Sequence, residues 1–347
     1  MASSDQPLDY KASGVDIDAG HETVRRIKNL ARATHTPGVL SEIGSFGGLF
    51  SLAPGGWRDP VLVSSADGVG TKLKVAFLAG EHRTIGLDLV NHCVNDILVQ
   101  GAVPLFFLDY LATGRLSPDV AEQIVTGLAR GCRENGCALL GGETAEMPGF
   151  YADGEYDVAG FIVGAVERDA LIDGRSIRAG DVLIGLPSTG LHTNGYSLAR
   201  KIVFDRLGLS VDSHVPELGE TAGEALLRPH RSYLDAMKPL VGTGVIKGMA
   251  HITGGGITDN LPRVFPEGLG AVVRRDAWIV PPLFRWLQQA GDVPEADMRR
   301  ACNMGIGLIV VVSPDEAAAV AAGLVSRGEA PVTIGEMVAG LEGVTYA

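Results

Sequence analysis

Residues 61–72 combine an apolar, β-branched run with the residue types that bind a nucleotide phosphate. The run predicts a buried strand, and a short polar turn follows it: Asp67, Gly68, Val69, Gly70, Thr71 and Lys72. The two glycines permit positive φ and let backbone N–H groups approach a ligand closely. Because a carboxylate binds Mg²⁺ while turn amides and an ammonium bind phosphate oxygens, the segment predicts a nucleotide phosphate site. The alternative is an ordinary strand and turn with a solvated lysine, since the spacing matches neither GxxxxGK[ST] nor GxGxxG.

A helix predicted over residues 84–101 has a polar stripe that contains no Lys, Arg or Glu. Its members recur at helical spacing and therefore share one side: Asp88, Asn91, His92, Asn95 and Asp96. Short carboxylates and amides packed together suit a hard cation, and like charges two turns apart repel unless a metal or a proton relieves them. The stripe predicts metal ligands. The alternative is a row of hydrogen bonds to backbone at a domain contact.

Three later segments place polar groups beside glycines at the ends of predicted strands. A short strand at 137–140 leads into Gly141, Gly142 and Glu143, which repeats the pairing of carboxylate and exposed backbone. Residues 187–196 bring His192 and Asn194 to a helix start, where N–H groups and the helix dipole favour an anion. A third anion cradle is predicted at Gly254, Gly255 and Gly256. The alternatives are a structural histidine at 192 and glycines needed only for tight packing at 254–256.

Length and composition describe a two-domain globular protein. The 347 residues suit about two domains, and 46% hydrophobic content supplies apolar surface for two cores. Strands that alternate with helices predict an α/β (α+β) architecture. We place the boundary in the turn-rich crossing near residue 173, which gives domains at 1–172 and 173–347.

Charge and cysteine content narrow the partners and the compartment. A formal net charge of −12 argues against nucleic acid or an anionic membrane as partner. No basic region followed by an apolar one begins the chain, and no apolar stretch reaches the ~18–20 residues of a membrane span. The four cysteines form no CxxC pair. We therefore expect reduced thiols and a cytoplasmic location.

The motifs together resemble the phosphoribosylformylglycinamidine cyclo-ligase (AIR synthetase) family of purine biosynthesis. The most specific are Gly-Gly-Glu-Thr-Ala-Glu-Met-Pro-Gly at 141–149 and Leu-His-Thr-Asn-Gly-Tyr-Ser-Leu at 191–198. The resemblance runs nearly end to end through 13–20, 67–72, 95–96, 253–256 and 303–307. Two positions depart from the family pattern, with Ala66 where Thr is usual and Cys302 where Phe is usual.

The resemblance implies ATP-dependent closure of formylglycinamidine ribonucleotide to aminoimidazole ribonucleotide, with release of ADP and phosphate. It implies Mg²⁺ held by Asp67, Asn95, Asp96 and Glu143, with ATP bound by these groups, by the turn through Lys72, by Gly142 and by Lys11 on an N-terminal flap. Lys72, His192 and Asn194 are implied as catalytic residues, and Gly254 to Gly256 as the cradle of the ribose phosphate. It also implies a homodimer that closes a β-barrel between the first domains, with the active site in the cleft between the two domains.

Related ATP-using proteins are the rival interpretations. Selenophosphate synthetases have a reactive Cys or selenocysteine near a glycine-rich N-terminus, whereas the first cysteine here is Cys93. Hydrogenase maturation factors end in a functional cysteine, whereas this chain ends in Thr345, Tyr346 and Ala347. The amidotransferase-linked synthetase of the preceding step usually belongs to a longer chain, and thiamine phosphate kinase is a further relative.

Overall fold

The first half of the chain forms a four-stranded sheet that carries three helices on one face. The computed structural model describes residues 13–44 and 46–347. The sheet has the order β1-β4-β2-β3, from β1 (Pro60–Gly68), β2 (Val103–Thr113), β3 (Ala138–Glu146) and β4 (Tyr156–Glu167). β2 and β3 are parallel, and the other pairs are antiparallel. This topology leaves β1 and β3 as the two edges.

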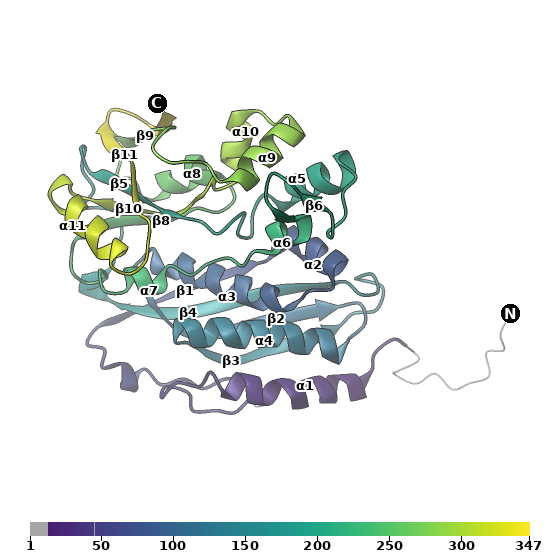
Figure 1. Cartoon of the computed structure of the whole chain (residues 1–347). Helices are drawn as coiled ribbons and strands as arrows, with labels where there is room; N and C mark the ends of the chain where they lie inside the picture. The colour runs from purple at the N-terminus through teal and green to yellow at the C-terminus, as the bar shows by residue number, and fades with distance from the viewer. Residues whose placement is uncertain (1–12, 45) are drawn as a thin grey trace, which may run out of the picture.

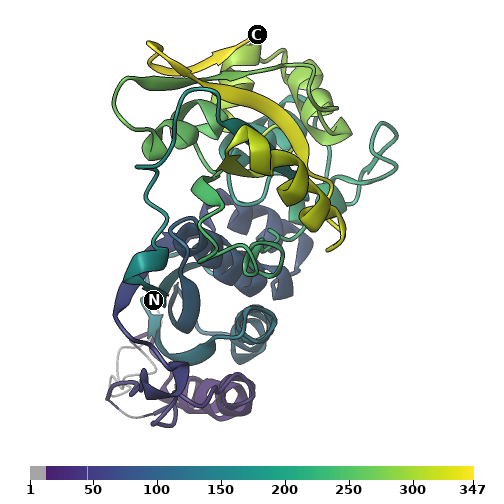
Figure 2. The same cartoon turned by 90° about the vertical axis from the view of Figure 1, so that its left-hand side faces the viewer.

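Helices α3 (Arg83–Leu98), α4 (Pro118–Asn135) and α1 (Ile17–Arg32) lie side by side over that face, as Figures 1 and 2 show from two directions. α3 packs on β1 and β4, α4 on β2 and β3, and α1 on α4 and the β3 edge. The bounds of α4 follow from its sequence, because Pro118 suits the first helical position and Gly136 takes φ 69° just after the last.

The opposite face of the first sheet carries no helix among the described residues (Figure 2). Strand register places Leu62, Tyr110 and Phe161 on this open face, because Phe161 pairs with Ala66 and successive side chains alternate between faces. Their exposures are 58%, 37% and 44%. A row of exposed large apolar side chains on one sheet face is typical of a surface that another molecule covers.

The second half forms a six-stranded sheet in the order β12-β9-β11-β5-β10-β8. Its strands are β5 (Val182–Pro187), β8 (Ile246–His251), β9 (Leu269–Val273), β10 (Ile306–Val312), β11 (Val332–Ala339) and β12 (Gly343–Tyr346). All seven residues of β10 are buried. The packed helices are α8 (Gly256–Asn260), α9 (Pro282–Gly291), α10 (Glu295–Ala301) and α11 (Pro314–Val325).

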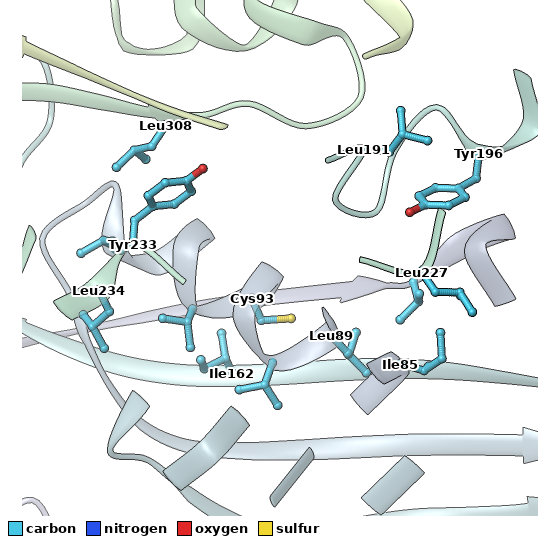
Figure 3. Close-up of a cluster of buried hydrophobic side chains, with 14 of the residues drawn as sticks. Ile85, Leu89, Cys93, Ile162, Leu191, Tyr196, Leu227, Tyr233, Leu234 and Leu308 are labelled. Atoms are coloured by element: carbon cyan, nitrogen blue, oxygen red, sulfur yellow. The ribbon is translucent and has the colours of Figure 1, made fainter. Parts of the chain in front are cut away.

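Helix α3 lies between the two halves and is buried on nearly every side. Figure 3 shows Leu89 and Cys93 of α3 next to Ile162 of β4, with Tyr233 and Leu227 of the second half above the helix. Leu89 is fully buried, so Leu89→Ala would cost roughly 2–5 kcal/mol of stability. The polar side of α3 therefore faces the second half instead of solvent.

The predicted α/β (α+β) class is confirmed. The predicted end of the strand at 137–140 is wrong: β3 continues to Glu146 because β2 pairs with it as far as Thr113. Residues 222–237 contain two short helices, α6 (Ala222–Leu227) and α7 (Leu234–Met237). The boundary near residue 173 falls between β4 and β5 and stays a prediction. No helix in the described ranges has the length and apolar character needed to cross a membrane.

Candidate functional site at the domain interface

Two carboxylates from different elements meet at one imidazole. Asp67 stands near the end of β1, and Asp96 in the last turns of α3. His92 Nε2 lies 2.7 Å from Asp67 Oδ2 and 3.7 Å from Asp96 Oδ2. The second oxygen of Asp96 lies 2.8 Å from His251 Nδ1, at the end of β8 in the second half. The predicted approach of Asp67 and Asp96 is therefore present in the fold.

The protonation of these groups follows from their contacts. Burial by itself raises the pKa of Asp67 and Asp96, but the hydrogen bonds and charges of His92 and His251 bring each pKa below its ordinary value. Burial lowers the pKa of His92, and the two neighbouring carboxylates reverse that effect, so its pKa is raised. The site thus holds two anionic carboxylates around one imidazole that favours a proton.

The network continues across the domain interface and closes on itself. His92 Nδ1 lies 2.6 Å from Thr193 Oγ1, which lies 3.4 Å from His230 Nδ1. His230 Nε2 lies 3.1 Å from His251 Nε2. Side chains of both halves therefore hold Asp67 and Asp96 in place, and the site requires the two halves to be docked.

Most of the polar stripe of α3 serves the domain contact that was the alternative interpretation. The Asp88 carboxylate accepts the His230 N–H at 2.6 Å, and Asn91 donates to the His230 carbonyl at 2.8 Å. The Asn95 side chain accepts the Tyr233 N–H and donates to the Arg231 carbonyl. The prediction of Asn95 as a metal ligand is therefore wrong for this arrangement, because its amide is used on residues 231–233. Only the part of the stripe with His92 and Asp96 faces Asp67.

Lys72 also lies elsewhere than predicted. Its side chain is fully buried, and Nζ lies 2.7 Å from Asp88 Oδ2. Nζ also donates to the carbonyls of Arg228 at 2.8 Å and His192 at 3.2 Å. An ammonium has three donors: two are used on these carbonyls, and the Asp88 carboxylate supplies the opposite charge. The lysine is neither a solvated side chain nor a phosphate ligand in this structure.

The turn after Asp67 keeps part of its predicted character. Gly70 has φ 62°, the left-handed conformation for which glycine is suited. The Gly68 N–H donates to the Asp67 carboxylate at 2.6 Å, so that amide orients the carboxylate. Val69 is fully buried beneath the turn. Thr71 Oγ1 lies 3.0 Å from Ser197 Oγ, which ties the turn to the second half.

The loop at 189–196 brings its predicted residues to the same interface. His192 is 1% exposed, has φ 62°, and accepts the Thr189 N–H on Nε2. Its ring stacks on that of His230 with centroids 4.0 Å apart. Asn194 borders the glycine loop, since a Cβ added to Gly254 would lie 3.1 Å from Asn194 Oδ1. A left-handed, buried histidine is uncommon, and such residues cluster at functional sites.

The glycine loop at 254–256 serves the close packing of two chain segments more than the binding of an anion. The Gly255 N–H donates to the Arg300 carbonyl and the Gly256 N–H to the Thr253 carbonyl, at 2.9 and 3.0 Å. A Cβ at Gly256 would collide with the Arg299 carbonyl. The predicted anion cradle is wrong for Gly255 and Gly256, because their amides already have acceptors and the glycines serve close packing.

Glu143 and Gly142 lie at the far edge of the first sheet. Register runs from Asp67 through Gly160 and Asp109 to Gly142, so about three strand spacings, roughly 14 Å, separate the two edges. Glu143 pairs with Tyr110 and shares the open face, whereas Asp67 faces α3. Within one chain Glu143 does not join Asp67 and Asp96. It lines a cavity of about 670 Å³ with Gly142 and Asp109. Lys11 lies outside the described residues.

Several residues of the site were not predicted. His92 belonged to the stripe, and its i, i+4 spacing from Asp96 was a usable signal. No local signal indicated His251 and Thr193, because these residues reach Asp96 and His92 from elements far along the chain. Burial raises the pKa of Asp109, which lines the cavity beside Glu143, to about 7.

The donor set suits Mg²⁺. Asp67 and Asp96 supply hard oxygen ligands, and their side chains are 43% and 25% exposed, which leaves room for the water ligands that Mg²⁺ retains. Both carboxylates approach His92 Nε2, and two acidic groups placed this close together favour a cation. A divalent cation therefore matches the charge that this part of the structure attracts.

Comparison with known proteins gives consistent results along the whole chain. Residues 57–166 match the model of the AIR synthase related protein N-terminal domain, and residues 178–346 match the C-terminal domain. The phosphoribosylformylglycinamidine cyclo-ligase of Trichlorobacter lovleyi is 56% identical over 328 residues, 94% of each chain. That of Desulfitobacterium hafniense is 56% identical over 337 residues, which cover 97% of this chain and 98% of the relative.

Solved structures share the fold at low identity. A thiamine-monophosphate kinase from Stenotrophomonas maltophilia superposes with a TM-score of 0.69 at 19% identity, covering 94% of this chain and 95% of the kinase. A hydrogenase maturation protein HypE in complex with ATP has a TM-score of 0.67 at 20% identity, covering 94% of this chain and 88% of HypE. These similarities extend over both halves and describe one two-domain architecture.

Proposed function

The chain belongs to the phosphoribosylformylglycinamidine cyclo-ligase family, and from this premise we propose that it converts formylglycinamidine ribonucleotide and ATP to 5-aminoimidazole ribonucleotide, ADP and phosphate in de novo purine biosynthesis. The structural observation that supports this function is the convergence of Asp67 and Asp96 on His92 at the domain interface. The residues around these carboxylates include members of the cyclo-ligase motifs at 67–72, 95–96 and 191–198.

The reaction requires activation of an amide oxygen, which is a poor leaving group. Transfer of the γ-phosphoryl group to that oxygen creates a leaving group, the amidine nitrogen attacks the carbon, and phosphate departs. Such a transfer depends on positioning and charge neutralisation. Mg²⁺ bound to Asp67 and Asp96 would neutralise charge on the triphosphate. His251 orients Asp96 through a hydrogen bond, and His92 Nε2 lies close to both carboxylates.

The ATP phosphates are assigned to the turn that follows Asp67, where the backbone amides of Val69, Gly70 and Thr71 are the proposed donors. Formylglycinamidine ribonucleotide is assigned to the interdomain side, next to His192 and Asn194 on the 189–196 loop. Gly254, which neighbours Asn194, is the member of the glycine loop retained for the ribose phosphate. Each of these proposed sites lies next to the Asp67 and Asp96 carboxylates or next to the 189–196 loop.

A homodimer through the open face is part of this proposal. Leu62, Tyr110 and Phe161 give that face an apolar surface, and two such sheets facing each other would bury it. If the sheets close into a barrel, each edge strand adjoins the partner, so the β3 edge with Gly142 and Glu143 would stand at the subunit boundary. Glu143 would then complete a nucleotide site between two chains instead of within one. The four buried free thiols suit the reducing cytoplasm.

One assay tests the function. The purified protein, Mg²⁺ and ATP are incubated with and without formylglycinamidine ribonucleotide, and phosphate release and the aminoimidazole product are measured. We expect both only when the ribonucleotide is present. Thiamine monophosphate is the control substrate, because a kinase shares the fold. Phosphate release without the ribonucleotide, or phosphorylation of the control substrate, would contradict the proposal.

A further inference from the structure

We infer that the buried Lys72–Asp88 ion pair is the positioning device that holds the second half of the chain in register with the Asp67 and Asp96 carboxylates. The expected effect of the ion pair on catalysis rests on the proposed function. Its expected effect on the position of the second half rests on the structure alone. Lys72 and Asp88 both belong to the first half, and each also binds backbone atoms of the second half.

The pair joins two separate segments of the second half. Lys72 Nζ donates to the carbonyls of His192 and Arg228 at 3.2 and 2.8 Å. Asp88 Oδ2 forms an ion pair with Lys72 Nζ at 2.7 Å, and Oδ1 accepts the His230 N–H at 2.6 Å. One ion pair therefore fixes the main chain of the 189–196 loop and of the segment at 228–230. These partners are backbone groups, so the contacts set where the loops lie, whichever side chains they carry.

The pair is built on the two elements that carry the site. Lys72 ends the short 3₁₀ turn that follows Asp67, and Asp88 lies two helical turns before Asp96 on α3. A shift of the 189–196 loop relative to the carboxylates would break the contacts of Lys72 or Asp88. The loop presents His192 and Asn194, so the pair controls their distance from the Asp67 and Asp96 centre.

Burial makes this device stiff and excludes a phosphate from it. Both side chains are 0% exposed, and the ammonium lies 5.6 Å from the centre of the Tyr196 ring. A buried ammonium requires compensation, and here two backbone carbonyls and the Asp88 carboxylate provide it. Tyr196 is itself fixed through its hydroxyl to the Leu226 carbonyl at 2.5 Å. Phosphate binding by Lys72 would require it to leave both carbonyls and the Asp88 carboxylate.

The experiment compares four variants of the full chain: Lys72→Met, Asp88→Asn, Lys72→Met with Asp88→Leu, and Lys74→Met. Asp88→Asn keeps an oxygen for the His230 N–H and replaces the oxygen that faces Lys72 with an amide NH₂, which removes the ion pair. The double variant leaves no unpaired buried charge, which is the main reason a single variant would fail to fold. Lys74→Met is the matched control, because Lys74 is 42% exposed and pairs with Glu155.

Hydrogen exchange tests the mechanical part without reference to catalysis. We expect amides of residues 189–196 and 228–233 to exchange about tenfold faster in Asp88→Asn and in the double variant, while the strands of both sheets stay protected. Lys74→Met should match the wild type. Unchanged exchange in both segments would overturn the inference even if the cyclisation assay succeeds, and faster exchange would uphold it even if that assay fails.

Kinetics and ATP binding test the catalytic part. A loop displaced by about 1 Å lowers kcat by about 100-fold, so we expect that loss in Asp88→Asn and in the double variant, with the dissociation constant of Mg²⁺–ATP unchanged by calorimetry. If Lys72 instead binds phosphate, every Lys72 variant loses ATP affinity while Asp88→Asn retains wild-type kcat. That second pattern would overturn the inference.

Discussion

His92 Nε2 lies 2.7 Å from the carboxylate of Asp67 and 3.7 Å from that of Asp96, so one imidazole joins the end of β1 to the last turns of α3. The next imidazole, His251, contacts the other oxygen of Asp96 from the second half. The carboxylates are therefore set by three elements at once. Removal of any one group is expected to disturb the geometry of the others.

Asp96→Ala should abolish Mg²⁺-dependent turnover. The substitution removes a proposed metal ligand and leaves His251 without its acceptor, and we expect kcat to fall about 10³-fold, as when a charge-stabilising group is deleted from an active site. Circular dichroism should show the fold retained. Near-normal turnover in this variant would mean that Asp96 serves only the domain contact, as Asp88 and Asn91 do.

His251→Ala should weaken the metal site without removing a ligand. His251 orients Asp96 through a 2.8 Å hydrogen bond, and loss of such an outer contact costs about 10–100-fold in metal affinity or activity. The measurement is the Mg²⁺ concentration that gives half-maximal phosphate release, at saturating ATP and ribonucleotide. We expect this concentration to rise, with part of the activity recovered at high Mg²⁺. An unaltered Mg²⁺ dependence with a lower kcat would place His251 in another role.

Phe161→Glu should dissociate the proposed dimer. Phe161 is 44% exposed on the open face of the first sheet, and a carboxylate there would have to be desolvated when two faces meet. Light scattering coupled to size exclusion should report the mass of one chain for the variant and of two for the wild type. Ile279→Glu is the control, because Ile279 is 84% exposed in the second half. A wild-type mass of one chain would contradict this part of the proposal.

Asp109→Asn should stabilise the protein more at pH 8 than at pH 5. Burial raises the pKa of Asp109 from 3.8 to about 7, so the unfolded chain releases this proton well below the pH at which the folded chain does. The contribution of Asp109 to stability is present below about pH 4 and is lost as pH rises to about 7. Asparagine does not titrate, so its advantage should grow across that window and then remain constant.

Urea unfolding of both proteins at pH 5 and pH 8 gives the comparison for Asp109→Asn. Asp119→Asn provides the control, since Asp119 is 80% exposed on α4. An equal effect of Asp109→Asn at the two pH values would show that the wild-type carboxyl is already ionised at pH 5.

Local patterns in the sequence determined the elements and the family. The β-branched run before Asp67 predicted β1, Pro118 and Gly136 bounded α4, and the Gly-Gly-Glu and Leu-His-Thr-Asn segments identified the cyclo-ligase motifs. These inferences rest on neighbouring residues, because backbone preference and side-chain periodicity act within a few residues of the chain. The prediction that Asp67 and Asp96 lie close together is also confirmed, because both residues belong to the recognised motifs.

Tertiary structure alone decided what the polar side chains bind. Lys72 and Asn95 have the chemistry of a phosphate and a metal ligand, yet each is used on backbone groups more than 100 residues away in the chain. Glu143 stands on the other edge and face of the sheet because β3 continues through the glycine pair. When burial removes water, a polar side chain must bind whichever protein group the fold places beside it. A local sequence pattern does not indicate which distant backbone group that will be.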